Sequence, residues 1–334
     1  MRRGSLAAFS FALVVLAFAG VAGAAPGGLG PPAPQTDSGE AISHLYWAVF
    51  TVCAIVFVAV ETALVLFIIR FRRRRGTPET AEGPQIHGNT RLEVIWTIIP
   101  AVILAAIAIL TLTRIPAVEA KGSDELLIKV EAHQFYWQYD YPNGAVSFDE
   151  LRIPVERTIA LEIVTHDVNH SWWVPALTGK KDAIAGQTNT LRFKAKHTGT
   201  WEGQCAEFCG IQHAVMFTRV TVLSQADYDS WVEQQNSISD RDLGEQEWGA
   251  VCAKCHGLAG EGDIGPGIAG NPILTNRQAL IHLLSQGQDT EQFESYMPPV
   301  GLGWTGTQYD ALVAYIKATP KLATAPPAGG QSGG

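Results

Sequence analysis

The sequence predicts a multi-domain membrane protein with a two-helix transmembrane hairpin, an exported all-β sandwich or barrel, and an all-α domain at the C-terminus. Three observations support this fold class. Two long apolar runs lie before residue 115, short β-rich runs follow at 124–223, and helical patterns with Gly-rich loops occupy 243–320. Of the 334 residues only 17% are charged, below the roughly 25% typical of soluble domains.

Composition excludes several classes of protein. The net charge of −8 argues against a nucleic-acid partner, and five cysteines are too few for a small disulfide-stapled scaffold. Four of these five cysteines form two tight pairs, Cys205 with Cys209 and Cys252 with Cys255. Such clustering indicates metal or cofactor chemistry.

Residues 1–25 have the layout of an export signal peptide: two arginines, an apolar run and a small-residue end, with Ala22-x-Ala24 as the cleavage site. An uncleaved first membrane helix is the alternative. Residues 26–44 are rich in Pro and Gly near their start and are interpreted as an exported linker.

The transmembrane hairpin is expected over residues 45–114. Its two apolar runs, Leu45–Ile69 and Val94–Thr113, are each long enough to cross a bilayer. The loop between them, 70–91, contains six arginines, whereas residues 26–44 contain no Lys or Arg. The positive-inside rule therefore places the loop in the cytoplasm and the following domains outside. This predicts a multi-pass protein of the bacterial inner membrane with periplasmic or extracellular domains.

The exported part divides into four segments. A β domain is expected over 115–225, a linker over 226–242, a helical domain over 243–320, and a disordered tail over 321–334. Residues 115–240 carry 10 basic and 17 acidic residues, and residues 241–334 carry 5 and 9. Both exported parts are acidic, which favours a cationic partner outside the membrane.

A metal-binding pattern lies near the end of the β-rich region. Cys205, Cys209, His213 and Met216 stand within twelve residues, and His170 lies upstream at the end of a probable strand. Thiolate, thioether and imidazole together select copper or zinc, and methionine favours copper. Two cysteines four residues apart can bridge two copper ions. A structural disulfide is the alternative, although it would not require the histidine and methionine.

Four motifs resemble subunit II of the haem–copper cytochrome c oxidases. They are C-x-E-x-C-x-x-x-H-x-x-M from Cys205, DVNHSWWVP at 167–175, QFYWQYDYP at 134–142 and LEVIWTIIP at 92–100. The resemblance covers about residues 41–225 and implies a cupredoxin-like β-barrel that holds a dinuclear copper A centre. The implied metal ligands are His170, Cys205, Glu207 through its backbone carbonyl, Cys209, His213 and Met216.

The same resemblance suggests roles for three further groups of residues. The Glu207 side chain would help to bind a magnesium ion shared with subunit I. In the family a tryptophan receives electrons at the position of Phe135, so Phe135 and Trp137 are candidates for electron acceptance, with simple core packing as the alternative. Glu93 matches a glutamate at the entrance of a proton pathway, with an interfacial helix anchor as the alternative.

The second cysteine pair belongs to the pattern Cys252-x-x-Cys255-His256, which is typical of c-type haem attachment. A zinc or redox C-x-x-C site is the alternative. Met297 is the only downstream methionine and the candidate sixth iron ligand, with His282 as its rival. Residues 243–320 resemble a class I cytochrome c domain, so the whole chain resembles the caa-type bacterial oxidases.

The resemblance implies an electron-transfer subunit of a cytochrome c oxidase. Electrons would be accepted at a covalent haem c, pass to two copper ions and leave to the haem–copper subunit I, which reduces oxygen to water and pumps protons. The implied partners are oxidase subunits I and III, membrane lipid, and an external donor such as cytochrome c or a bc1-type complex, with no nucleic acid. Alternatives are a copper A domain of another reductase, similar to nitrous oxide reductase, a quinol oxidase subunit II, and a copper-binding assembly factor.

Overall fold

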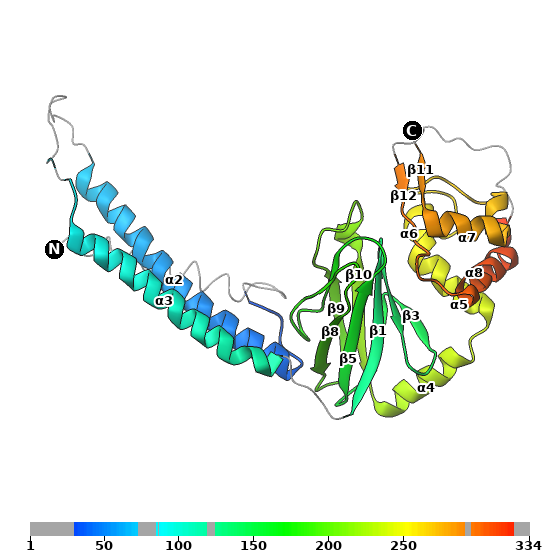
Figure 1. The fold of residues 1–334 in the computed structure, drawn as a ribbon, viewed down its shortest axis with the longest axis horizontal. Coiled ribbons are helices and arrows are strands. Elements are labelled where there is room, and N and C mark those ends of the chain that lie inside the picture. The colour runs from blue at the N-terminus through cyan, green and yellow to red at the C-terminus, as the bar shows by residue number, and fades with distance from the viewer. Residues whose placement is uncertain (1–29, 73–84, 86, 119–123, 291–294, 324–334) are drawn as a thin grey trace. The chain divides into compact units, whose positions relative to one another are not determined.

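The structure is a computed structural model that describes residues 30–72, 85, 87–118, 124–290 and 295–323 (Figure 1). It divides into two compact units. The first contains the two long helices, and the second contains residues 35–38 together with everything described after residue 123. The expected signal peptide at 1–25 lies outside the described residues, as does most of the arginine-rich loop.

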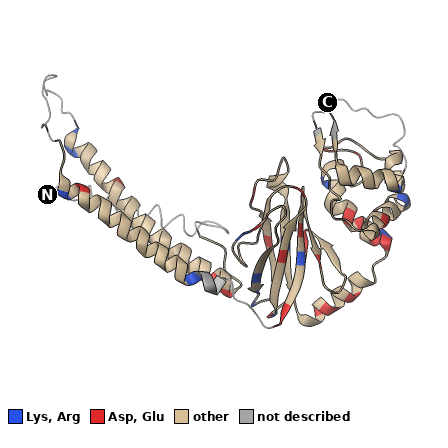
Figure 2. Ribbon diagram, viewed as in Figure 1, with Lys and Arg blue, Asp and Glu red and all other residues tan. Residues whose placement is uncertain are grey.

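The first unit is formed by α2 (Asp37–Phe71) and α3 (Thr90–Val118). Both helices are long and apolar enough to span a membrane. Their large apolar side chains are mostly exposed, as surfaces that face lipid or partner helices must be. Figure 2 shows that charged residues are sparse along both helices.

The N-terminal boundary of α2 differs from the expected linker over 26–44. The helix already begins at Asp37, so residues 37–44 are helical. The segment before it is tied to the second unit: Thr36 forms a β-bridge with Ala195, and the Asp37 carboxylate lies 2.7 Å from Lys196 Nζ. Acidic side chains favour the first turn of a helix because they face its positive end, and Asp37 and Glu40 stand there.

The second unit opens with a domain of two five-stranded sheets at residues 124–223, the β domain. One sheet has the order β3-β2-β1-β5-β8 and the other β4-β10-β9-β6-β7. The strands are β1 (Glu125–His133), β2 (Tyr136–Asp140), β3 (Val146–Phe148), β4 (Glu150–Pro154), β5 (Thr158–Thr165), β6 (His170–Trp173), β7 (Lys181–Ala183), β8 (Asn189–Lys194), β9 (Gly199–Cys205) and β10 (Phe217–Leu223). Pairing is parallel between β1 and β5 and between β4 and β10, and antiparallel elsewhere.

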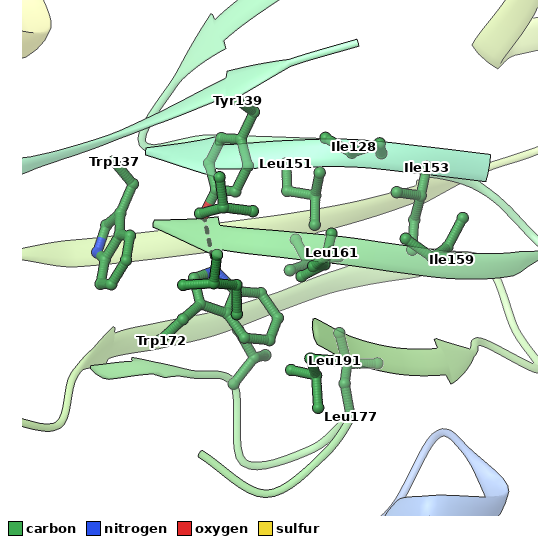
Figure 3. Close-up of a cluster of buried hydrophobic side chains, with 14 of the residues drawn as sticks. Ile128, Trp137, Tyr139, Leu151, Ile153, Ile159, Leu161, Trp172, Leu177 and Leu191 are labelled. Atoms are coloured by element: carbon green, nitrogen blue, oxygen red, sulfur yellow. Dashed lines mark hydrogen bonds between the residues drawn. The ribbon is translucent and has the colours of Figure 1, made fainter. Parts of the chain in front are cut away.

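The core of the β domain lies between its two sheets. Alternate strand residues such as Ile128, Ile159 and Leu161 are fully buried, as the period-two pattern of a strand requires (Figure 3). The indole N–H of Trp172 donates to the Tyr139 hydroxyl at 2.9 Å, which satisfies a polar group within this core. The result is a rigid frame whose loops carry the cysteine pair.

The C-terminal domain, residues 240–323, is mainly helical and is joined to the β domain by α4 (Gln225–Asn236). Its elements are α5 (Asp240–Glu247), the π-helical turn η2 (Trp248–Cys252), α6 (Ala253–His256), η3 (Pro272–Thr275), α7 (Arg277–Gln286), β11 (Gln288–Thr290), β12 (Ser295–Met297), α8 (Gly306–Ala318) and α9 (Pro320–Ala323). Helices α5 and α8 cross closely, because a Cβ at Gly244 would lie 2.1 Å from the Ala311 carbonyl oxygen.

Two boundaries of this domain differ from expectation. Helix α4 covers most of the expected linker over 226–242, and α5 already begins at Asp240, where the Ser239 side chain caps it. The expected tail over 321–334 is shorter, because α9 includes Lys321–Ala323 and Leu322 is fully buried. The rest of that tail lies outside the described residues.

Candidate metal centre and haem-attachment site

The first site is built around the cysteine pair of the β domain. Cys205 ends β9, Cys209 lies in the following loop, and their Sγ atoms are 3.9 Å apart. Both thiols are buried and free. A disulfide requires an S–S distance of about 2.05 Å, so Cys205 and Cys209 do not form a structural disulfide in this structure.

Four other donor atoms surround the two sulfur atoms. Around Cys205 Sγ lie the Glu207 carbonyl oxygen at 3.2 Å and His170 Nδ1 at 3.9 Å. Around Cys209 Sγ lie His213 Nδ1 at 3.7 Å and Met216 Sδ at 3.8 Å. His170 comes from β6 in the neighbouring part of the sheet, whereas the other donors belong to the loop between β9 and β10. Soft sulfur donors with imidazole nitrogen fit copper ions.

The orientation of His170 is set by Asp167. His170 Nε2 lies 2.8 Å from Asp167 Oδ1, so Nδ1 is left to face the cysteine pair. The other carboxylate oxygen accepts the backbone N–H of Gln134 at 2.7 Å. Burial raises the pKa of Asp167, but these hydrogen bonds outweigh burial and hold it below its usual value. Sequence reasoning did not assign a role to Asp167, although it stands in the motif DVNHSWWVP.

The two thiols differ in acidity. Their mutual contact lowers the pKa of Cys205 and raises that of Cys209. Metal binding requires both thiols to be deprotonated, so loading of the site releases their protons.

The second site lies in the C-terminal domain, at the end of η2 and in α6. Cys252, Cys255, His256 and Met297 line one cavity. His256 Nδ1 lies 2.8 Å from the Pro266 carbonyl oxygen, which leaves Nε2 as the free ring nitrogen. Gly265 permits this approach, because a Cβ there would lie 2.9 Å from the ring of His256.

The walls of this cavity suit a large apolar cofactor. Most of its lining side chains are apolar, and they come from helices on several sides: Trp248, Val251, Leu280, Leu283, Leu284, Leu312 and Ile316. Two thiols, an imidazole and a thioether in the wall of one cavity match the attachment chemistry of haem c. His282, the rival of Met297, is not among the described residues that line the cavity.

The remaining candidate residues are divided between several environments. Phe135 lines the cavity of the C-terminal domain, whereas Trp137 is fully buried with its ring 6.1 Å from that of His170. Glu93 lies in the first turn of α3, where its carboxylate accepts the Asn89 N–H at 3.2 Å. Sequence reasoning missed Gln212, whose Nε2 lies 3.7 Å from Cys255 Sγ, and no sequence signal marked this contact.

Comparisons with known proteins match all three parts of the chain. Family descriptions match three stretches: "Cytochrome C oxidase subunit II, transmembrane domain" at 24–113, the "periplasmic domain" of the same subunit at 147–223, and "Cytochrome C oxidase, cbb3-type, subunit III" at 239–316. Cytochrome c oxidase subunit 2 of Alkalihalophilus pseudofirmus is 35% identical over 240 residues, covering 67% of this chain and 68% of that protein. The subunit of Thermostichus vulcanus is 29% identical, covering 62% and 79%. A crystal structure of the periplasmic domain of subunit II from Bradyrhizobium japonicum is 32% identical, covers 34% of this chain and 96% of that one, and superposes with a TM-score of 0.34.

A two-helix membrane anchor, a copper-binding β domain and a c-type cytochrome domain define a membrane-bound respiratory electron-transfer protein. The chain belongs to the cytochrome c oxidase subunit 2 family, in the form that carries a cytochrome c domain at its C-terminus. It is part of a haem–copper oxidase complex and transfers electrons to subunit I. The predicted family, fold class, function and membrane location are confirmed, as are a copper A site and a haem c.

Proposed function

We propose that six residues hold the dinuclear copper A centre of this oxidase subunit: His170, Cys205, Glu207 through its carbonyl oxygen, Cys209, His213 and Met216. The observation that carries this assignment is the convergence of all six donors on the Cys205–Cys209 pair. Asp167 holds the His170 ring in place, and the buried sheet frame limits movement of the loop. When bound, the copper pair shares one electron at a time between the two ions.

We also propose how the C-terminal domain holds its haem. Cys252 and Cys255 form the thioether links, His256 is the proximal iron ligand, and Met297 is the distal ligand. Support comes from the shared cavity and from the hydrogen bond that fixes the His256 ring. Histidine with methionine ligation favours a high reduction potential, which suits a group that accepts electrons from an external cytochrome c or bc1-type complex.

A magnesium ion shared with subunit I is proposed at the Glu207 side chain. That side chain is 48% exposed, and its carboxylate lies 4.0 Å from Lys180 Nζ, so it is available on the outside of the copper loop. The same loop carries the exposed apolar residues Phe208 and Val215, which supports contact with a partner subunit there. Subunit III is proposed as a further partner within the complex.

Two further roles are proposed for individual residues. Glu93 marks the entrance of a proton pathway, a role compatible with its position in the first turn of α3. Phe135 takes part in electron acceptance by the copper site, since its side chain lines the haem cavity. Trp137 is the less exposed candidate and packs within the β-domain core beside His170.

The copper assignment is tested by metal analysis and near-infrared absorption of the purified oxidase. Cys209→Ser should abolish the dinuclear site, because a hydroxyl does not bridge copper ions as a thiolate does. Cys53→Ser, at an exposed thiol of α2, is the matched control and should leave both signals unchanged. Two copper ions and an intact band in Cys209→Ser would contradict the assignment.

A further inference from the structure

The middle of the haem-attachment motif is bound to the β domain. Lys254 stands between Cys252 and Cys255, and its ammonium group donates to the Phe135 carbonyl oxygen at 3.0 Å. The same group forms an ion pair with the Asp149 carboxylate, and both side chains are about three-quarters buried. A charged hydrogen bond in such an environment is stronger than one exposed to water.

Asp149 is held rigidly on the β domain before Lys254 binds it. One carboxylate oxygen accepts the Trp137 N–H at 2.9 Å, and the Asp149 N–H donates to the Trp137 carbonyl at 2.8 Å. Its φ of 55° lies in the left-handed region, which aspartate tolerates better than most residues. The second carboxylate oxygen is thereby fixed toward Lys254.

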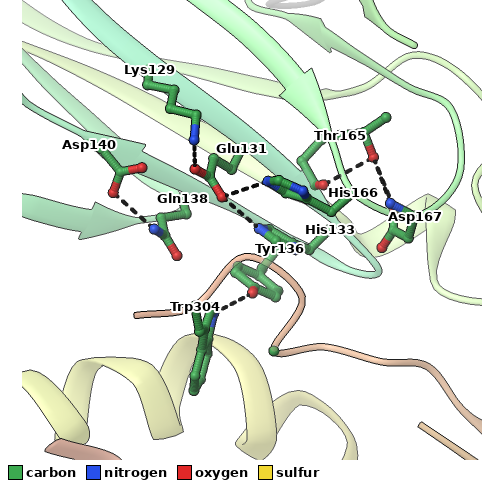
Figure 4. A network of polar contacts seen from close by, with 12 residues as sticks. Lys129, Glu131, His133, Tyr136, Gln138, Asp140, Thr165, His166, Asp167 and Trp304 are labelled. Carbon is green, nitrogen blue, oxygen red and sulfur yellow. Dashed lines mark hydrogen bonds and ion pairs between the residues drawn. The ribbon is translucent and has the colours of Figure 1, made fainter. Parts of the chain in front are cut away.

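A second attachment lies on the other side of the haem cavity. The Tyr136 hydroxyl donates to the Val300 carbonyl oxygen at 2.6 Å. It also accepts the Trp304 indole N–H at 2.8 Å (Figure 4). Val300 follows the candidate ligand Met297 by three residues. Tyr136 is fully buried and packs within the core of the C-terminal domain, although it belongs to β2.

The β domain and the C-terminal domain pack closely against each other around Tyr136. Gln308 Nε2 donates to Gln138 Oε1 at 3.0 Å, and both side chains are buried. A Cβ at Gly303 would lie 2.9 Å from His166 Nε2 and 3.0 Å from Glu131 Oε2. This backbone approach leaves no room for water and shows that the loop after Met297 rests directly on the β domain.

Between the two attachments, the β domain itself forms part of the haem cavity wall. Gln134, Phe135, Ile211 and Gln212 line the cavity together with Cys255 and His256. Gln134 Nε2 also donates to the Cys209 carbonyl at 2.6 Å, and a Cβ at Gly210 would lie 3.0 Å from the Phe135 ring. The residues that touch the haem cavity are therefore in direct contact with the copper loop.

We propose that Lys254 and Tyr136 are positioning residues that clamp the haem-attachment segment and the Met297 loop onto the β domain. The clamp holds the two redox sites at one fixed separation and turns this face of the haem cavity away from outside donors. The proposal rests on the proposed copper and haem assignments for its function, but the clamp is a property of the polypeptide contacts.

Hydrogen–deuterium exchange on the purified, full-length oxidase tests the clamp. Lys254→Gln and Tyr136→Phe should each accelerate amide exchange at residues 298–305 by about tenfold, equivalent to about 1.4 kcal/mol. The double variant should exceed either single one. Lys317→Gln and Tyr315→Phe are matched controls within the C-terminal domain and should leave this exchange unchanged. Asp149→Asn keeps an acceptor for the Trp137 N–H and removes the charge, so it should reproduce Lys254→Gln if that variant fails to fold.

A second readout is the distance between the haem and copper spins, measured by pulsed electron paramagnetic resonance. The wild-type distribution should be narrow, and the double variant should broaden it while copper and haem contents stay the same. Unchanged exchange and an unchanged distribution in the double variant would overturn the clamp. Failure of the copper or haem assignment would instead appear as two copper ions and an intact near-infrared band in Cys209→Ser, or as an unchanged haem potential in Met297→Ala, and neither result alters the reading of the exchange data.

Discussion

His170 Nε2 lies 2.8 Å from Asp167 Oδ1, on the side of the imidazole ring that faces away from the cysteine pair. This contact fixes which ring nitrogen is offered to copper. Partners of this kind raise the basicity of a metal-binding histidine and are nearly as important as the ligand itself.

The first prediction concerns His166, Asp167 and His170 in the segment THDVNH. His170→Asn should abolish the copper spectrum, because it removes a ligand. Asp167→Asn should retain copper but weaken its affinity by about 10–100-fold, because the ring loses its orientation. His166→Asn should leave the spectrum intact, since His166 Nε2 faces Glu131 at 3.1 Å. Copper titration followed by near-infrared absorption measures all three, and the reverse order for His166 and His170 would contradict the ligand assignment.

The second prediction concerns the distal haem ligand. Met297→Ala should leave the haem covalently attached but open the sixth coordination position to exogenous ligands. The reduction potential should fall by roughly 0.1 V or more, since axial ligands set potentials over a range of about 0.8 V. His282→Ala is the control and should change neither property. Potentiometric titration of the haem measures both variants. A lowered potential in His282→Ala, with an unchanged potential in Met297→Ala, would identify His282 as the distal ligand.

The third prediction uses a buried carboxyl of the C-terminal domain. Glu247 is fully buried, and neither of its carboxyl oxygens has a hydrogen-bond partner among the described residues. Burial raises the pKa of Glu247 to about 9 from an ordinary value of 4.5. The unfolded chain therefore loses this proton first as the pH rises. The stability linked to the neutral carboxyl is complete below pH 4.5 and is lost progressively toward pH 9.

Glu247→Gln should remove this dependence on pH. At pH 8 its haem-domain unfolding temperature, followed by Soret absorption of the full-length protein, should exceed that of the wild type by several degrees. At pH 5 the difference should be small. Glu245→Gln, at an exposed position on the same helix, should follow the wild type. A parallel pH dependence in Glu247→Gln and the wild type would show that this carboxyl is not the cause.

The structure brings the residues of the local motifs together, and those motifs could be recognised in the sequence because they lie in short stretches. The donors from Cys205 to Met216 fall within one loop, and the attachment motif at Cys252 lies on one turn. The same reasoning did not find the contacts that join the domains. Lys254 and Asp149 are 105 residues apart, and Tyr136 and Val300 are 164 apart. Only tertiary packing brings such residues together, and no spacing pattern records it.

The sequence also did not predict the boundaries of strands in the β domain or its short edge strands. The run 126–141 reads as one β segment but forms two strands, because β1 and β2 pair as an antiparallel hairpin around Gln134 and Phe135. The three-residue strands β3 and β7 are too short to give a periodic signal. The aromatic run was linked to electron acceptance by resemblance, whereas Tyr136 turns out to pack in the C-terminal domain.

The last prediction concerns the fused C-terminal domain. Deletion of residues 240–334 should give an assembled oxidase with intact copper but poor turnover with external cytochrome c. In the full chain the domains are joined by α4, so transfer from the attached haem is intramolecular. Turnover from this internal haem should be nearly independent of salt, whereas transfer from an outside donor to the acidic domain should weaken with ionic strength.

Substituting tryptophan for Phe135 distinguishes two roles of the C-terminal domain. One is to keep its haem attached to the chain, and the other is to cover Phe135. The truncated protein exposes Phe135, because the C-terminal domain no longer covers the cavity face, so Phe135→Trp should partly recover oxygen uptake with cytochrome c there. The same substitution in the full chain should give no gain, since this side chain faces the internal haem cavity rather than an outside donor. Full activity in the truncated protein without the tryptophan would show that the fused haem is dispensable and that electrons reach the copper site by another face of the β domain.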